Sequence, residues 1–106
     1  MNYSKKNIFS FDENDFESEE IFETLAQGGG AKIERICSKE YENGRWYDQP
    51  EDEFVMLLKG EAKLEFGDGS LEMESGDYLT ISAHSRHRVA RASDGCVWLA
   101  VFGKFD

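Results

Sequence analysis

The chain of 106 residues is long enough for one folded domain and too short for two sizeable hydrophobic cores. The chain has 12 Lys and Arg residues and 22 Asp and Glu residues, and the resulting net charge of −10 opposes binding to nucleic acid or anionic lipid. No apolar run approaches the roughly 20 residues of a membrane span, and no apolar stretch follows the N-terminus as in a secretion signal. We therefore expect a cytoplasmic protein with no nucleic-acid or membrane partner.

Residues 1–30 are predicted to form an N-terminal arm and one short helix that pack on the rest of the chain. Residues 1–17 are polar with scattered aromatics, and we expect these aromatics to dock on the domain. Ser18 suits a helix N-cap, and one helical face would carry Ile21, Phe22, Leu25 and Ala26. The three glycines at 28–30 would end this helix, and no Lys-Ser/Thr pair follows them as in a phosphate-binding loop.

Residues 31–106 are predicted to form an all-β barrel. Six of its strands are expected at residues 31–38, 60–66, 71–74, 78–83, 86–92 and 96–102. Ala62, Leu64 and Phe66 alternate with charged residues, so these three side chains should face the core. Short strands separated by turn residues such as Gly67-Asp68-Gly69 favour a sandwich or a small barrel.

Two segments about twenty residues apart combine an apolar strand with polar residues that could coordinate a metal. The first spans residues 46–60, and the second spans residues 76–89 and holds both histidines, His84 and His87. Alternation in the second segment places His87 on the other face of the strand from Arg86 and Arg88, so His87 is predicted to point inward. An inward histidine is either hydrogen-bonded within the core or a ligand.

The spacing within these segments resembles that of the cupin family, whose members are double-stranded β-helix (jelly-roll) barrels. The family's first motif, Gly-x5-His-x-His-x3-4-Glu-x6-Gly, is matched at its end by Glu53 and Gly60. Its second motif, Gly-x5-Pro-x-Gly-x2-His-x3-Asn, is matched by Gly76 and His87. The resemblance covers residues 33–102 and is greatest to small single-domain bacterial cupins, which implies a jelly-roll barrel here.

The chain departs from the family pattern because neither histidine of the first motif is present. With a three-residue gap before Glu53, the two histidine positions fall on Tyr47 and Gln49. With a four-residue gap they fall on Trp46 and Asp48. A regular strand would put Tyr47, Gln49 and Glu53 on one face, although the acidic turn that follows could bring Asp48 inward instead.

The candidate metal ligands are therefore Asp48, Gln49, Glu53 and His87. The resemblance implies a divalent metal such as Mn, Zn, Ni or Fe, but this donor set is harder and weaker than three histidines and a glutamate, and it could also hold none. His84 could add a second imidazole only through a turn, because strand residues three apart lie on opposite faces. Without a metal, Glu53 would pair with His87 or with Arg91, which stands at the terminal asparagine of the second motif.

These residues together predict a small-molecule pocket inside the barrel. Glu53 and His87 would act there as general acid and base, or as ligands of a Lewis-acidic metal. The residues expected to bind the ligand are Trp46, Tyr47, Tyr78 and Arg91, although the aromatics could equally be ordinary barrel lining. Three hypotheses follow: an enzyme acting on a small polar metabolite, a non-catalytic binding module, and a structural subunit.

Two further features concern the cysteines and the oligomeric state. Cys37 and Cys96 are isolated in the sequence and predict two buried free thiols, or a disulfide if the protein is exported. Residues 96–102 are apolar on both faces, as in a strand covered on both sides. We therefore predict a homodimer.

Overall fold

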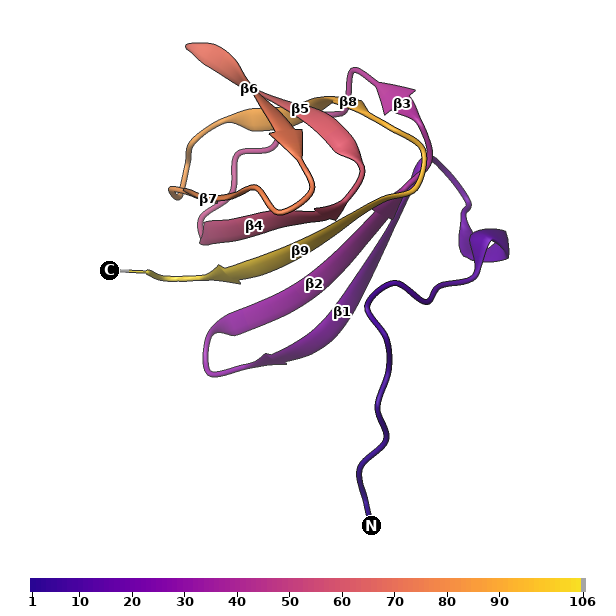
Figure 1. Cartoon of the computed structure of the whole chain (residues 1–106). Coiled ribbons are helices and arrows are strands. Elements are labelled where there is room, and N and C mark those ends of the chain that lie inside the picture. Colours follow the sequence, from indigo (N-terminus) through magenta and orange to yellow (C-terminus); the bar gives the residue numbers. More distant parts are fainter. Residues whose placement is uncertain (106) are drawn as a thin grey trace.

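The chain folds into two antiparallel β-sheets and one short 3₁₀ helix in a computed structural model that describes residues 1–105 (Figure 1). The elements are η1 (Glu13–Asp15), β1 (Glu20–Gly28), β2 (Ala31–Ser38), β3 (Tyr41–Glu42), β4 (Asp52–Lys59), β5 (Glu61–Phe66), β6 (Gly69–Glu74), β7 (Tyr78–Ile81), β8 (His87–Ala92) and β9 (Cys96–Gly103). The large sheet has the order β1-β2-β9-β4-β7, and the small sheet has the order β3-β8-β5-β6. This confirms the predicted all-β jelly-roll class.

The hydrophobic core lies between the two sheets and contains side chains from both. The strand alternation predicted for β5 is confirmed, since Ala62 and Leu64 are buried while Glu61 is exposed. The core consists of Val55, Leu57, Ala62, Leu64, Met73, Ile81, Ala92, Cys96 and Trp98. Cys37 and Cys96 are free and buried, which confirms the prediction of two buried thiols. Among the described residues, no helix has the length and apolar character needed to cross a membrane.

The helix predicted from residue 18 is wrong, because residues 20–28 form β1, an edge strand of the large sheet. Ile21 and Phe22 are neighbours on a strand, where they cover opposite faces of the sheet. A β-bulge between Thr24 and Ala26 then shifts the alternation, so the apolar residues acquire a spacing that resembles a helix. The boundary placed at residue 30 falls in the β1–β2 turn, where Gly29 and Gly30 have the positive φ angles, 59° and 80°, of a type I′ hairpin.

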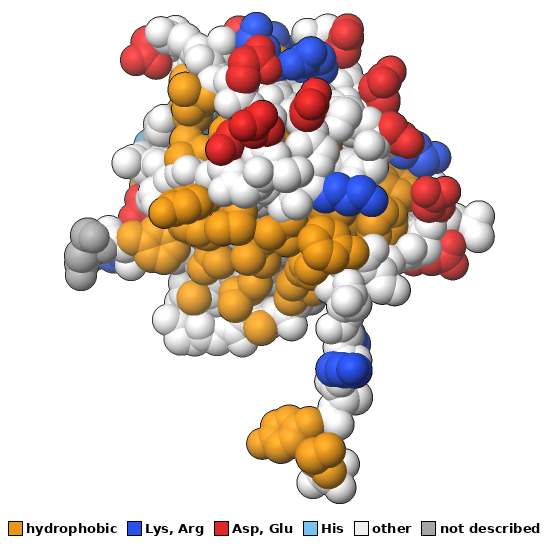
Figure 2. All heavy atoms as spheres, viewed as in Figure 1, with side chains coloured by type: hydrophobic (Ala, Val, Ile, Leu, Met, Phe, Trp, Pro, Cys, Tyr) orange, Lys and Arg blue, Asp and Glu red, His pale blue; other side chains and the backbone are white. Residues whose placement is uncertain are grey.

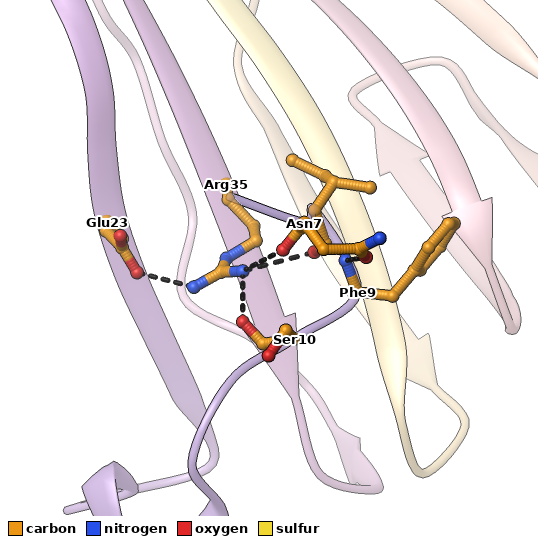
Figure 3. Close-up of polar contacts among 6 residues, drawn as sticks. Asn7, Phe9, Ser10, Glu23 and Arg35 are labelled. Atoms are coloured by element: carbon orange, nitrogen blue, oxygen red, sulfur yellow. Dashed lines mark hydrogen bonds and ion pairs between the residues drawn. The ribbon is translucent and has the colours of Figure 1, made fainter. Parts of the chain in front are cut away.

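The N-terminal arm lies against the outer face of the large sheet, the face turned away from the small sheet. The Arg35 guanidinium on β2 donates to three arm carbonyls, those of Asn7 (3.5 Å), Ile8 (3.1 Å) and Ser10 (2.8 Å). Its other nitrogen pairs with Glu23 on β1 (Figure 3). The arm is thus held by a buried charged side chain that satisfies carbonyls without a strand partner.

Two aromatic side chains of the arm also contact the body of the domain. Phe11 and Phe16 pack edge to face, with ring centroids 6.0 Å apart. The Arg35 guanidinium carbon lies 5.9 Å from the Phe11 ring centroid, and the Lys39 ammonium lies 5.3 Å from that of Phe16. Cations at these distances are attracted to the ring faces.

Candidate functional site

A cavity of about 270 Å³ opens between the two sheets. The large sheet contributes apolar and charged lining from all five of its strands, while the small sheet contributes Leu64, His87 and Val89 together with Tyr41 on β3. The loop before β4 closes one side with Tyr47, Gln49 and Glu51. The remaining lining residues are Glu20, Phe22, Lys32, Glu34, Ile36, Gly44, Arg45, Glu53, Val55, Ile81, Trp98 and Phe102.

Glu53 and His87 form a buried pair inside this cavity. Glu53 is the second residue of β4 and His87 the first of β8, and each is 6% exposed. The distance from His87 Nε2 to Glu53 Oε1 is 3.4 Å. The same carboxylate oxygen accepts a hydrogen bond of 2.9 Å from the Gln49 amide nitrogen. The inward trio predicted from the sequence, Gln49, Glu53 and His87, is therefore brought together.

The tautomer of His87 follows from its other contact. Its Nδ1 lies 2.8 Å from the Ser85 carbonyl oxygen, which can only accept, so Nδ1 carries a proton. Nε2 then faces the Glu53 carboxylate, and this contact is favourable only when Nε2 is protonated too.

The electrostatic balance at His87 favours the imidazolium. Burial lowers the pKa of His87, but the Glu53 hydrogen bond, the Ser85 carbonyl and the Glu53 charge together raise this pKa above its ordinary value of 6.5. Below this raised pKa the cavity holds an imidazolium–carboxylate pair in which Nε2–H is directed toward Glu53.

Two tyrosines provide further polar groups beside this pair. Tyr47 is joined to His87 by two backbone hydrogen bonds of 2.8 and 3.0 Å, and the two rings stack with centroids 6.1 Å apart. Burial raises the pKa values of both Tyr41 and Tyr47, and the nearby Glu20 carboxylate raises them further. Both phenols are therefore neutral; the Tyr41 hydroxyl is hydrogen-bonded to the Glu20 carboxylate, and the Tyr47 hydroxyl remains available as a hydrogen-bond donor.

The cavity carries more acidic than basic side chains. Its four carboxylates belong to Glu20, Glu34, Glu51 and Glu53. Of its two long cations, Lys32 pairs with Glu34 at 3.4 Å and lies over the Phe102 ring, while Arg45 lies over the Tyr47 ring. Burial raises the pKa of Glu20, and the neighbouring Tyr41 hydroxyl partly offsets this rise.

Asp48, predicted as a metal ligand, does not face the cavity. It lies on the loop before β4, where its carboxylate pairs at 3.0 Å with His84 on the exposed surface. His84 itself has a positive φ of 61° in the turn before β8, and its side chain points to Asp48 rather than to His87. Tyr47 and Gln49, one residue to either side of Asp48, line the cavity instead, which agrees with strand alternation.

Three residues predicted to bind the ligand, Trp46, Tyr78 and Arg91, lie outside the cavity lining. Trp46 packs against two arginines, with its ring centroid 4.1 Å from the guanidinium carbon of Arg86 and 4.8 Å from that of Arg88. These distances suit stacked cation–π contacts. Trp46 therefore faces outward, whereas the next residue, Tyr47, faces the cavity.

Tyr78 and Arg91 lie outside the cavity lining for different reasons. Tyr78 pairs with Met56 on the outer face of the large sheet and is 64% exposed. Arg91 has the same parity as His87, but the pairing with β5 jumps from Val89 to Arg91, and this bulge reverses the alternation. Arg91 therefore points outward and pairs with Glu72 at 2.9 Å.

Several lining residues were missed by the sequence reasoning. Glu20 and Phe22 stand on the segment that was assigned to a helix, so their cavity-facing positions were hidden. Lys32 and Glu34 stand on a correctly predicted strand, where alternation with Ile33 and Arg35 could have assigned them to the inner face.

With the fold and the cavity described, comparison with known proteins identifies the class. Residues 38–102 match the sequence profile of the Cupin domain family, which is more than half of the chain. The chain therefore belongs to the cupin family. A search of curated proteins found no match.

Among solved structures, the chain is similar to a protein from Ralstonia eutropha named as a candidate mannose-6-phosphate isomerase. The two are 38% identical with a TM-score of 0.86, covering 97% of this chain and 100% of that one. A cupin superfamily protein from Desulfitobacterium hafniense is 20% identical with a TM-score of 0.69, covering 85% and 82%. A structure named FeII HppE is 16% identical with a TM-score of 0.69, covering 78% and 49%. The last two likenesses show the fold alone.

The cavity residues do not fit the three-histidine, one-glutamate metal centre expected from the family motifs. Residues 1–105 contain no cluster of three or more His, Cys, Asp or Glu side chains that could hold a metal ion. Within the same described range, His87 is the only imidazole in the lining, and Gln49 presents its amide nitrogen to Glu53 rather than an oxygen to the cavity. Glu53 Oε1 accepts from Gln49 and faces His87, so both lone pairs of this one oxygen are engaged.

Proposed function

We propose that this cupin binds a small polar metabolite in its cavity and that Glu53 and His87 transfer a proton to and from it without a metal. The observation that carries the proposal is the buried Glu53–His87 contact of 3.4 Å within a lined cavity. A titratable pair in such a pocket, with the pKa of one member raised by its partner, is typical of acid–base sites.

The surrounding contacts support distinct roles for the two side chains. The Ser85 carbonyl fixes the tautomer and the plane of the His87 ring, which leaves the Nε2 proton as the one that a bound ligand can accept. Glu53 stabilises the charged ring before this transfer, and its carboxylate can accept a different proton from a carbon-bound hydrogen of the ligand, so that one proton leaves the ligand as another reaches it. Gln49 holds the carboxylate in place through its amide and is therefore a positioning residue.

The charges of the lining restrict the class of ligand. The lining has four glutamates but only two long basic side chains, Lys32 and Arg45, in the part of the chain that the structure describes. Lys32 is already paired with Glu34. An additional phosphate would be repelled by the carboxylates and would meet no cluster of basic side chains in the described lining. We therefore propose a neutral, hydroxyl-rich or cationic metabolite, whose hydroxyl groups could accept from Tyr47. Among relatives, the name of the Ralstonia eutropha protein points to an isomerase, whose chemistry can proceed by such proton transfers.

A non-catalytic binding role is the second candidate. Its support is the engagement of Glu53 Oε1 by Gln49, which makes the pair resemble a satisfied core contact. Binding would then occur without any proton exchange between the protein and the ligand.

One experiment separates these functions, with mannose and mannose 6-phosphate as a matched pair of probes within a panel of sugars and amines. We expect thermal-shift stabilisation by a neutral or cationic compound and none by its phosphorylated form. For a compound that binds, proton NMR in D₂O should show exchange of a carbon-bound hydrogen with solvent. His87→Gln should abolish this exchange while binding remains, and Asp48→Asn should leave both unchanged.

The outcomes decide among the proposals. Binding without exchange in the wild-type protein would favour the non-catalytic role. Preferential binding of phosphorylated compounds would contradict the proposed ligand class. Exchange that is lost with a chelator and restored by Mn²⁺ or Zn²⁺, together with stoichiometric metal by elemental analysis, would overturn the metal-independent mechanism.

A further inference from the structure

We propose that the cavity takes a primary amine, and that the Lys32 side chain occupies the subsite for its ammonium group until the ligand displaces it. The inference rests on the proposed function only in that the cavity binds a small metabolite, and it does not depend on proton transfer by Glu53 and His87. It narrows the ligand class from neutral or cationic compounds to cationic ones.

The position of the Lys32 ammonium is the first observation. Lys32 lines the cavity from β2, and its ammonium lies 3.4 Å from Glu34 Oε2 and 4.9 Å from the Phe102 ring centroid. A carboxylate attracts an ammonium ion by its charge, and an aromatic ring attracts it by its electron-rich face. The chain's own lysine therefore shows which chemical group this part of the cavity accommodates.

The two members of this ion pair differ in exposure. The Glu34 side chain is 11% exposed, whereas the Lys32 side chain is 41% exposed and carries its charge on a flexible four-carbon chain. The lysine can therefore swing into water, but the carboxylate stays in the cavity wall. A carboxylate buried without a partner is unfavourable, so the departure of Lys32 is favourable only when another cation takes its place.

Strand register places this subsite relative to the Glu53–His87 pair. Lys32, Phe102 and Glu53 are cross-strand partners on β2, β9 and β4, so they form one row across the inner face of the large sheet. Neighbouring strands lie about 4.8 Å apart, which separates the backbones of Lys32 and Glu53 by roughly 10 Å. A ligand that reaches both polar ends must therefore extend across the Phe102 ring, with its ammonium at one end and a hydroxyl group at the other.

The charge of the whole molecule also favours a cationic ligand. The net charge is −10, and Figure 2 shows acidic side chains concentrated toward the small sheet, which forms one wall of the cavity. A field of this sign raises the local concentration of small cations and repels anions. Amines would thus be enriched at the protein before they enter the cavity.

NMR titration of the isotope-labelled full chain with linear amino alcohols of three to eight carbons tests the ligand class. The diol of the same length is the neutral counterpart of each compound. We expect amino alcohols of suitable length to shift the signals of cavity residues, and we expect the matching diols to bind roughly tenfold more weakly or less. Equal binding of the two series, or no binding by any amino alcohol, overturns the inference. Either result leaves the sugar-binding and proton-exchange tests of the proposed function undecided, so the two failures are distinguishable.

Substitution of the lysine tests its displacement. Lys32→Gln removes the tethered competitor, so it should raise the affinity for a bound amino alcohol by about 2- to 5-fold. Lys39→Gln is the matched control, because the Lys39 ammonium lies 5.3 Å from the Phe16 ring centroid but outside the cavity lining. This control should leave the affinity unchanged. An unchanged or lower affinity in Lys32→Gln overturns the displacement.

A double substitution identifies Glu34 as the group for which the lysine and the ligand compete. Glu34→Gln should weaken amine binding by roughly tenfold or more, and circular dichroism would establish that this variant is folded. Adding Lys32→Gln to Glu34→Gln should then give no gain in affinity, because the shared partner is gone. The same gain in both backgrounds would overturn the assignment of the subsite. Because Lys32 is largely outside the packed core, its single substitution remains decisive even if Glu34→Gln does not fold.

Discussion

The Glu53→Gln substitution tests whether the buried pair carries an imidazolium. The introduced side chain would retain a carbonyl that accepts from the Gln49 amide, so the change removes the negative charge beside His87 and little else. Burial then remains as the largest influence on the pKa of His87, and burial lowers that pKa. The pKa of His87 should therefore be lower in the substituted protein than in the wild-type protein, because Nε2 no longer faces a negative charge.

The magnitude follows from the burial of the pair. Removing one partner of a buried ion pair costs about 3–5 kcal/mol when the other charge is left unpaired. His87 can instead lose its proton, so we expect the smaller cost of a weakened buried contact, about 1–3 kcal/mol. A single titrating group changes the free energy of unfolding by at most about 1.4 kcal/mol per pH unit.

The sign of the pH dependence is fixed by the direction of the shift. The raised pKa of His87 contributes stability that is fully present below the ordinary value of 6.5. That stability is lost as the pH rises through the pKa of the folded state. The advantage of the wild-type protein over Glu53→Gln should therefore be largest near pH 5.5 and should shrink toward pH 8.

Urea unfolding at several pH values measures this difference, and the second histidine–carboxylate pair supplies the control. His84 and Asp48 are 70% and 57% exposed, and exposed pairs contribute about 0–1 kcal/mol. Asp48→Asn should therefore change stability little at any of these pH values. The reasoning is refuted if the cost of Glu53→Gln is the same from pH 5.5 to pH 8, or if Asp48→Asn reproduces its pH dependence.

Two further predictions concern the barrel itself. Leu57→Ala should lower the free energy of unfolding by about 2–5 kcal/mol in urea titrations, because Leu57 is fully buried in the core, and a loss well below this range would contradict the assigned packing. Gly60→Ala should lower the thermal midpoint, because Gly60 has φ of 102° and an added Cβ would lie 2.6 Å from Cys96 Sγ. Gly67→Ala is its control, since a Cβ there meets no atom within 4 Å, and equal midpoints for the two variants would count against the steric argument.

Much of the fold could be predicted because strand alternation is a local property of the sequence. In β5 the charged and apolar residues alternate without interruption, and Ala62 and Leu64 are buried as expected. The same rule predicted that Tyr47, Gln49 and Glu53 share a face, although Pro50 and an acidic turn lie between them. Alternation therefore predicted which side chains face the interior wherever the strand backbone remained regular.

The failures occur where β-bulges or edge positions break that regularity. The bulge in β1 gave an edge strand the apolar spacing of a helix, which concealed Glu20 and Phe22 as cavity residues. The bulge in β8 turned Arg91 outward although its parity matches that of His87. A bulge depends on pairing with a strand distant in the sequence, so periodicity within one segment cannot locate it.

This chain keeps the spacing of the cupin motif glycines although it lacks the two histidines of the first motif. Gly60 and Gly76 both have positive φ angles, 102° and 96°, and the Gly76 amide donates to the Leu57 carbonyl oxygen at 2.7 Å. These glycines meet backbone requirements of the turns, which are the same whether or not a metal is bound. The positions between residues 46 and 49 impose no such requirement, so they can exchange imidazoles for a phenol and an amide without loss of the barrel. That exchange leaves Glu53 and His87 facing each other, and we propose that this pair transfers protons at the position where the family pattern ligates a metal.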